Sequence, residues 1–363
     1  MDDIAFLAVA QAHQHLHWLP VALRLARQPG VKVDVLSASR AALDFVRRYD
    51  RNGLLTLRFL PTPALHRDGL FTPPKRRMTL LLHHRTIGRY STIVTTEATS
   101  TLLKSIPGFH SALVYLMHGA GDRDGGYNNP KLKRFDYILV NGIKDKQRML
   151  DRDLGSEETI AVSGYAKFEL VGRPTPLFPD DKPIAFYNPH FDRRSSSWFD
   201  NAQAILDAMA IIGDWNFAVA PHVKLDRSAR IADGGPNLII DYGSVRSIDM
   251  SYTEAAHVYI GDVSSQVYEF IRRPRPCIFL NLDRIDWRAS PHYDHWRMGQ
   301  VIEDVASLGP ALARADALQP QFAELQRKMM ARSIDQSPLP ASERQARAIL
   351  DFIRGPAARA ATD

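Results

Sequence analysis

The sequence contains only one cysteine, Cys277, among its 363 residues. A single cysteine excludes an intramolecular disulfide and fits a protein that resides in a reducing compartment. Most lone cysteines are packing residues, so we favour packing over catalysis for Cys277.

Long hydrophobic runs are also absent, because every apolar stretch is far shorter than the ~20 residues that span a bilayer. Asp2 and Asp3 occupy the place where a secretory signal peptide carries its positive charges. We find no internal repeat, no low-complexity tract, no GxGxxG fingerprint and no P-loop. These absences predict a cytoplasmic protein.

Charge of one sign does not dominate. The net charge is +6 and the isoelectric point is about 9.4. This mild basic excess favours phosphate-rich ligands or an anionic membrane surface, and a solvated basic surface explains it equally well. No nucleic-acid-binding motif accompanies it, so we predict no nucleic-acid partner.

The order of apolar segments predicts an α/β fold. The chain is too long for one ordinary hydrophobic core, so we expect two domains. Strand-like runs alternate with helical segments such as 15–30, which is typical of parallel sheets buried on both faces. In the first half, strands are expected at 4–10, 31–39, 54–60, 92–97, 112–119 and 137–142.

The pattern restarts after a proline-rich polar stretch at 173–183, which we interpret as a linker. The sequence therefore predicts two Rossmann-like domains, 1–170 and 171–340, whose parallel sheets face a central cleft. A helix at 341–354, within the segment 341–363, is expected to cross back to the first domain and to end in a loose tail. In the second half, we expect a helix at 197–212 and strands at 184–189, 215–222, 237–243, 256–265 and 277–282.

Four predicted strands end in a polar residue beside glycine or proline. A single polar residue at a strand end is most often a turn or cap residue. Because ligands of such sheets bind outside the carboxyl ends of strands, four ends of this kind together predict a binding site. The four ends are His118, His222, Asp262 and the tripeptide Asn188-Pro189-His190.

The segment GDVSSQVYEF (261–270) passes from a strand into a helix. A helix that starts after Ser264 and Ser265 can bind an anion, and the two hydroxyls can bind a pyrophosphate. Glu269 follows about one turn later, where it can accept hydrogen bonds from ribose hydroxyls. The residues alone leave an alternative open, in which Ser264 is an N-cap and Glu269 an exposed helix carboxylate.

Two histidines suit catalysis. His118 precedes a glycine-rich loop, 119–126, that can hold the ring without burying it, and histidine titrates near neutral pH as a general base requires. His222 can donate a hydrogen bond to negative charge that develops on a phosphate.

These segments resemble the CDP-glycerol glycerophosphotransferases, the teichoic-acid polymerase type. YNPHFD (187–192) is similar to the family's Tyr-Ala-Pro-Thr-Trp-Arg motif, and the His-Gly pair at 118–119 to its His-Gly-Thr-Pro loop. The Pro-His pair at 221–222 is similar to Arg-Pro-His-Pro, and 261–270 to Asp-Tyr-Ser-Ser-x-x-x-x-Asp-Phe. Order and approximate spacing agree over residues 110–285, and before residue 110 the likeness is architectural only.

The resemblance implies a GT-B fold with the acceptor on the first domain and the nucleotide on the second. It implies that a hydroxyl of a lipid or glycan attacks the β-phosphorus of CDP-glycerol and releases CMP, without a metal or other cofactor. On this mapping His118 is the base, and His222 with the serine hydroxyls contacts donor phosphates. The substrate-binding residues are then Gly119, Asn188, Pro189, His190, Lys224, Asp262, Ser264, Ser265 and Glu269.

The chain departs from the family pattern at three places. Thr-Pro-Leu-Lys after His-Gly is replaced by the acidic, glycine-rich segment 120–124, Ala220 stands where an arginine precedes Pro-His, and His190 replaces a threonine. Lys224, Arg193 or Arg194 can supply the missing positive charge.

Two other interpretations remain open. One is a nucleotide-sugar glycosyltransferase or a relative of UDP-N-acetylglucosamine 2-epimerase, and the other is a nucleotide-binding protein without turnover.

Two further segments carry weaker signals. If residues 73–90 are helical, their basic side chains and leucines can bind the anionic inner face of the cytoplasmic membrane. An ordinary solvated helix explains the pattern equally well. His13, His15 and His17 follow the first strand in an expected loop, where they can line the cleft. A metal site there is less favoured, and the sequence shows no ligand spacing typical of zinc.

Overall fold

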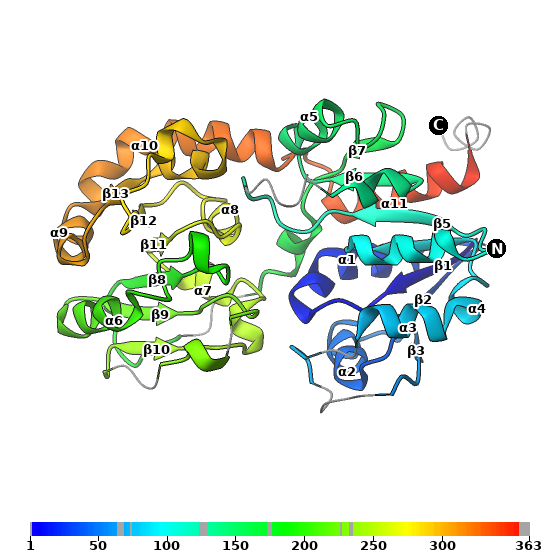
Figure 1. The fold of residues 1–363 in the computed structure, drawn as a ribbon, viewed down its shortest axis with the longest axis horizontal. Coiled ribbons are helices and arrows are strands. Elements are labelled where there is room, and N and C mark those ends of the chain that lie inside the picture. Colours follow the sequence, from blue (N-terminus) through cyan, green and yellow to red (C-terminus); the bar gives the residue numbers. More distant parts are fainter. Residues whose placement is uncertain are drawn as a thin grey trace. The chain divides into compact units, whose positions relative to one another are not determined.

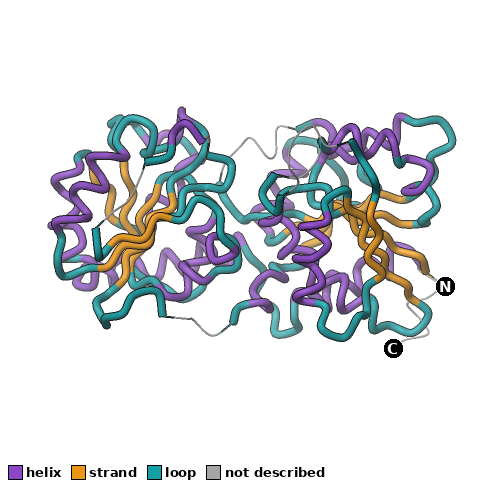
Figure 2. Tube along the Cα trace, turned by 90° about the horizontal axis from the view of Figure 1, so that it is seen from below, coloured by secondary structure: helices purple, strands orange, loops and turns teal. Residues whose placement is uncertain are grey.

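The protein is described here as a computed structural model, in which residues 2–63, 69–72, 75–122, 129–172, 176–225, 227–231 and 235–355 are placed. The chain forms two compact units. Each unit contains one parallel sheet with helices on both faces (Figures 1 and 2), which confirms the predicted α/β class with two Rossmann-like domains. The first unit combines Met1–His118, Gly125–Leu170 and Ile334–Asp363, and the second combines Gly119–Asp124 with Val171–Ser333.

The first sheet has the strand order β3-β2-β1-β4-β5-β6-β7, and all neighbouring strands are parallel. Successive residues of β1 enter opposite cores, because Ile4 and Phe6 pack on one face and Ala5 and Leu7 on the other. The strands are β1 (Asp2–Leu7), β2 (Val31–Ser37), β3 (Thr56–Phe59), β4 (Thr92–Thr95), β5 (Ala112–Leu116), β6 (Tyr137–Val140) and β7 (Ile160–Val162).

The last helix of the chain, α11, belongs to the first unit and packs against α1 (Figure 1). Ile349 of α11 is fully buried in the core that Ile4 also enters. The other face of the sheet is covered by α3 and η1 through Leu80 and Leu103. The helices of this unit are α1 (Ala12–Leu25), α2 (Arg40–Tyr49), α3 (Arg76–Leu82), α4 (His84–Ile87), η1 (Ala98–Ser105), η3 (Pro130–Arg134), α5 (Ile143–Asp151), η4 (Ala166–Leu170) and α11 (Ala341–Arg354).

The second sheet has the order β10-β9-β8-β11-β12-β13, again with parallel neighbours. The chain starts at β8 in the middle, adds β9 and β10 on one side, and then adds β11 to β13 on the other side. The strand order therefore reverses between β8 and β11. The strands are β8 (Ile184–Asn188), β9 (Asn216–Val219), β10 (Leu238–Ile240), β11 (Val258–Gly261), β12 (Cys277–Leu280) and β13 (Gln300–Ile302).

The two faces of the second sheet differ in composition. Tyr187 and Ile260 join a largely aliphatic core with α6 and α9, whereas Phe186, Tyr259 and Phe279 face an aromatic core. The helices are η5 (Arg193–Ser195), α6 (Ala202–Ile211), η6 (Arg227–Ala229), η7 (Val245–Ser247), α7 (Ser251–Ala255), α8 (Gln266–Phe270), η8 (Trp287–Ala289), η9 (Pro291–Met298), η10 (Val305–Ser307), α9 (Leu308–Ala313) and α10 (Ala315–Ser333).

Several details differ from the sequence predictions. The strands β7 and β13 were not predicted, although β10, which is equally short, was. Helix α1 begins at Ala12, so the histidines expected in a loop lie on a helix. The described part of 73–90 forms two short helices that meet at His83 instead of one. Residues 123–126 of the glycine-rich loop, 173–175 of the linker and 356–363 of the tail lie outside the described residues.

Candidate functional site

The carboxyl ends of β8 and β11 are neighbours, since Asn188 pairs with Gly261 in the sheet register. The strand order reverses at this point, and open parallel sheets bind ligands outside the strand ends at such a reversal. The loops that begin at Pro189 and Asp262 therefore define the candidate site of the second unit.

The carboxylate of Asp262 joins three backbone segments at this edge. Its Oδ1 accepts the N–H groups of His190 and Val263 at 2.9 and 2.7 Å. Its Oδ2 accepts the N–H and the hydroxyl of Ser197 at 2.9 and 3.0 Å. Burial raises the pKa of Asp262 to about 6, while these donors favour the charged form. Asp262 thus fixes the shape of the surrounding loops.

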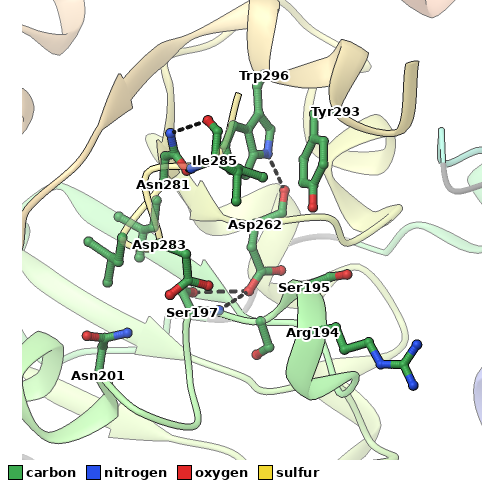
Figure 3. Close-up of a pocket in the computed structure, with 13 residues that line it drawn as sticks. Arg194, Ser195, Ser197, Asn201, Asp262, Asn281, Asp283, Ile285, Tyr293 and Trp296 are labelled. Carbon is green, nitrogen blue, oxygen red and sulfur yellow. Dashed lines mark hydrogen bonds between the residues drawn. The ribbon is translucent and has the colours of Figure 1, made fainter. Parts of the chain in front are cut away.

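A small cavity of about 30 Å³ lies beside Asp262, between the loops that follow β8 and β12. Figure 3 shows Tyr293 and Trp296 on one side of Asp262, with the guanidinium of Arg194 pointing away from it. Asn281 closes another wall, because its side chain binds both the N–H and the carbonyl of Ile285. The cavity has room for a few water molecules or one small polar group.

Ser264 and Ser265 form the turn between β11 and α8. In the described part of the chain, neither of their backbone N–H groups donates to a protein acceptor. The Ser264 hydroxyl accepts the N–H of Gln266 at 3.4 Å, a long distance for a helix cap. Because α8 has only five residues, the helix dipole expected from the sequence adds little. Ser264 is only 3% exposed and Ser265 is half-buried, so the hydroxyl of Ser265 is the more accessible of the two to an anion.

His190 and His222 lie on adjacent strand ends, with ring centroids 5.9 Å apart. Each Nδ1 accepts a backbone N–H at 3.1 Å, from Asp192 and Lys224 respectively. Because Nδ1 accepts, the ring proton lies on Nε2 in both histidines, and both rings can act as donors. The Nζ of Lys224 lies 5.1 Å from the centroid of the Phe191 ring.

Six of the predicted substrate-binding residues are buried: Asn188, Pro189, His190, Asp262, Ser264 and Glu269. The Asn188 amide donates to the carbonyl of Ala220 at 2.7 Å, and the His222 N–H donates to the carbonyl of Pro189 at 3.0 Å. These contacts support the two histidines from behind. In this conformation the side chain of Asn188 has no exposed surface.

Gly119 reaches the same edge from the loop after β5. Its φ is +77°, and a Cβ at this position would lie 3.1 Å from the Oγ of Ser265. The backbone angle therefore favours glycine, and any side chain here would also force the Ser265 hydroxyl to shift by a few tenths of an ångström. Residues 119–122 pack with the second unit, and His118, the residue bonded to Gly119, belongs to the first.

His118 is half-buried within the first unit, where it clusters with two other histidines. The rings of His13 and His17 each lie 6.1 Å from its ring, centroid to centroid. His13 and His17 are four residues apart on α1 and so share one helix face. Burial lowers the pKa of His17, and the nearby charges of Lys167 and His118 lower it further.

His15 does not join this cluster, so the prediction that it lines a cleft was wrong. Its ring is fully buried, lies 5.6 Å from the Trp18 ring, and neither ring nitrogen has a hydrogen-bond partner. Burial lowers the pKa of His15 to about 3 and keeps the ring neutral. Among the described residues, no three potential ligands gather in a way that could hold a metal ion.

Sequence reasoning missed three residues that shape the site: Ser197, His295 and Trp296. The Nε2 of His295 and the Nε1 of Trp296 each donate to the carbonyl of Asp262 at 2.7 Å. Their segment precedes β13, which itself gave no strand signal. The adjacent histidine and tryptophan were the only local hint of a buried polar contact.

Comparison with known proteins identifies the fold but no family. No family model and no curated protein matches the chain. The chain is similar to the wall teichoic acid polymerase TagF, in a histidine-to-asparagine variant soaked with CDPG. The two share 14% identity over 97% of this chain and 88% of that one, with a TM-score of 0.68.

Two further structures show the same likeness. A Listeria monocytogenes protein named as a UDP-N-acetylglucosamine 2-epimerase shares 13% identity over 100% of this chain and 97% of that one, with a TM-score of 0.64. S. aureus MnaA, solved with UDP, shares 11% identity over 98% and 97%, with a TM-score of 0.65. The protein therefore has the two-domain, Rossmann-like GT-B fold of these enzymes. No helix in the described ranges is both long and apolar enough to cross a bilayer.

Proposed function

We propose that the protein is a transferase that moves a glycerol-phosphate or related polyol-phosphate unit from a CDP-activated donor, most simply CDP-glycerol. The acceptor is a hydroxyl of a lipid or glycan. The acceptor oxygen bonds to the β-phosphorus, the bond from that phosphorus to the bridging oxygen breaks, and CMP leaves with the bridging oxygen. His118 takes the hydroxyl proton, as a general base.

One observation carries the proposal, the gathering of polar donors at the strand-order reversal of the second sheet. The N–H groups and hydroxyls of Ser264 and Ser265 suit the donor diphosphate. The Nε2–H groups of His190 and His222 suit the negative charge that grows on phosphate oxygens during transfer. The similarity to TagF soaked with CDPG supports a donor of this chemistry.

The second candidate is a nucleotide-sugar enzyme, either a glycosyltransferase or a 2-epimerase. Its support is that the named 2-epimerase and the UDP-bound MnaA have TM-scores of 0.64 and 0.65, close to the 0.68 of TagF. The same donors at the strand-order reversal would then bind a UDP diphosphate.

We also propose that the enzyme reaches its acceptor at an anionic membrane surface. Leu81 and Leu82 are 49% and 55% exposed on α3, and exposed cationic side chains flank them. Arg76 does not contribute, because it binds Glu97 and the carbonyl of Val9. The resulting surface, here called the α3 patch, consists of Lys75, Arg77, Leu81, Leu82, Arg85 and Arg89.

The proposed reaction is tested by CMP release from CDP-glycerol in the presence of a panel of lipid and glycan acceptors. We expect release by the wild type and a fall of roughly 10²- to 10⁴-fold in His118→Ala, the usual contribution of a general base. His110→Ala, an exposed histidine of the first unit, serves as the matched control and should retain the wild-type rate.

Two results would contradict the proposal. Nucleotide binding without CMP release for any acceptor would favour a non-catalytic nucleotide-binding protein. Unchanged release in His118→Ala would remove His118 from the mechanism.

A further inference from the structure

The loop after β5 is tied into the second unit by close backbone packing. Besides Gly119, Gly121 also lies against Ser265, where a Cβ would be 3.0 Å from the Ser265 Cβ. Such a distance is tighter than nine in ten real Cβ contacts, so a side chain at this position would push the loop and the serine turn apart by a few tenths of an ångström.

Asp122, the next residue, adds a buried polar contact. Its Oδ2 accepts the hydroxyl of Tyr268 at 2.7 Å and lies 3.2 Å from the Nδ1 of His295. The Nε2 of His295 donates to the carbonyl of Asp262, as does the Nε1 of Trp296. All five residues are at most 2% exposed. A continuous buried chain of contacts therefore runs from the loop at Asp122 to the strand end at Asp262.

The number of protons in these buried contacts explains why Asp122 and His295 attract each other. A carbonyl oxygen only accepts, so the Nε2 of His295 carries a proton. The contact between Nδ1 and the Asp122 carboxyl then needs one more proton, either on the ring or on the carboxyl. In both cases the two residues share one proton and the pair has no net charge. Removing either partner would leave the other buried without its counterpart, which is strongly unfavourable.

We propose that Asp122 and His295 form a clasp that positions the loop 119–122 on the Ser264–Ser265 turn. The clasp fixes the peptide that directly follows His118. Both are positioning residues, because they act through Gly119, Gly121 and the Asp262 carbonyl. The effect on turnover rests on the proposed transferase function, whereas the effect on the loop does not.

The clasp gives a physical reason for the departure of segment 120–124 from the family pattern. Gly121 permits the approach to Ser265, and Asp122 supplies the acidic partner of a histidine that lies 173 positions later in the chain. The acidic residue of this glycine-rich loop is therefore explained by its contact with His295 of the same chain.

The test compares Asp122→Ala with Asp122→Asn, using Asp207→Ala on the exposed surface of α6 as the control. Amide hydrogen exchange of residues 119–122 should become at least tenfold faster in Asp122→Ala and stay near wild type in Asp122→Asn. The asparagine amide can donate to the Nδ1 of a neutral His295, and so keeps the contact. Because misplacement by about 1 Å can cost roughly 10²-fold in rate, we expect kcat for CMP release to fall about 10²-fold in Asp122→Ala. KM for the donor should change by less than about threefold, since the serine turn itself remains.

Each outcome separates the clasp from the proposed reaction. Faster exchange in Asp122→Ala, together with near wild-type exchange in Asp122→Asn, supports the clasp. This holds even if the wild type releases no CMP, because the absence of CMP release would contradict only the transferase proposal. Unchanged exchange in Asp122→Ala, or no rescue by Asp122→Asn, overturns the clasp. If Asp122→Ala does not fold, Tyr268→Phe, which removes one donor to Asp122, should show a smaller rise in exchange, and no rise would overturn the clasp.

Discussion

At the scale of single residues, Asp262 holds the loops of the site together, but its burial lowers the stability of the fold as the pH rises. Its pKa is raised from the ordinary 3.8 to about 6, chiefly by burial. Between these values the native state keeps a proton that the unfolded chain has lost. The stability from this proton is therefore fully present below about pH 4 and is lost as the pH rises through about 6. A shift of this size corresponds to about 3 kcal/mol.

Asp262→Asn removes this titration, so the variant should lose less stability than the wild type between pH 4 and pH 7. The gap in the free energy of unfolding between wild type and variant should narrow by about 3 kcal/mol over that range. Urea unfolding followed by tryptophan fluorescence measures this, because four of the five tryptophans lie in the second unit: Trp198, Trp215, Trp287 and Trp296. A gap that widens with pH would show that the carboxylate is favoured by its donors more than it is penalised by burial.

The pKa of His15 is shifted in the opposite direction, so His15 has the opposite effect on the pH dependence of stability. Its pKa is lowered from 6.5 to about 3 by burial, so the unfolded chain binds a proton that the native state excludes. The contribution of neutral His15 to stability is fully present above about pH 6.5 and is lost as the pH falls towards 3. His15→Leu, similar in volume and never charged, should unfold at a lower pH in an acid titration followed by circular dichroism. His110→Leu, at an exposed site, should leave the acid midpoint unchanged, and an equal shift in both variants would contradict this explanation.

The residues of the site were predictable only where strand ends mark them. His222, Asp262, Ser264 and Ser265 stand directly after apolar runs, and the structure brings them to one sheet edge. His295 could not be predicted, because its partner Asp122 lies 173 positions away and no local pattern joins the two. The burial of His15 was missed because its position on α1 depends on where the helix begins.

At the scale of elements, α3 combines an anchored side with an exposed one. Leu80 is fully buried and Arg76 binds Glu97, whereas Leu81 and Leu82 face solvent. We expect the α3 patch to bind vesicles that contain anionic lipid, because each basic side chain near such a surface contributes about 1 kcal/mol. Neutral vesicles should bind much less protein.

Sedimentation with vesicles tests this expectation. Replacing Leu81 and Leu82 by serine should weaken binding to anionic vesicles, and so should replacing Arg77 and Arg85 by glutamine. An equivalent pair of changes on exposed α10, Arg327→Gln with Lys328→Gln, is the control and should bind like the wild type. Equal binding by the wild type and the leucine variant would exclude the α3 patch as the membrane contact.

Most strands were predictable because a continuous apolar run marks each of them. All eleven predicted strands occur, since strands buried on both faces read as continuous apolar runs. Their predicted ends ran too far, as at 256–265, where β11 stops at Gly261 and the polar site residues follow. The break at His83 between α3 and α4 has no proline or glycine before it, so no local signal predicts two helices.

At the scale of the whole molecule, the two sheets share one topology. Each starts with an inner strand, extends to one side and then to the other. The alternation of strands and helices predicts two such sheets, but strand order comes from packing and from the handedness of the crossovers. The packing of residues 119–122 within the second unit is a tertiary feature, because it depends on Ser265, Tyr268 and His295.

The position of the site at the second sheet predicts that a nucleotide stabilises the second unit specifically. At a concentration of 100 times its Kd, a ligand adds about 2.7 kcal/mol to the free energy of unfolding of the part that binds it. We expect CDP or CMP to raise the midpoint of the tryptophan-monitored transition, and UDP to have little effect. The double variant Ser264→Ala with Ser265→Ala should lose most of this stabilisation, because two hydroxyl donors to the diphosphate are gone. Stabilisation by UDP instead of CDP would replace the transferase proposal by a nucleotide-sugar enzyme. Full stabilisation of the serine variant by CDP would place the nucleotide away from this strand-order reversal.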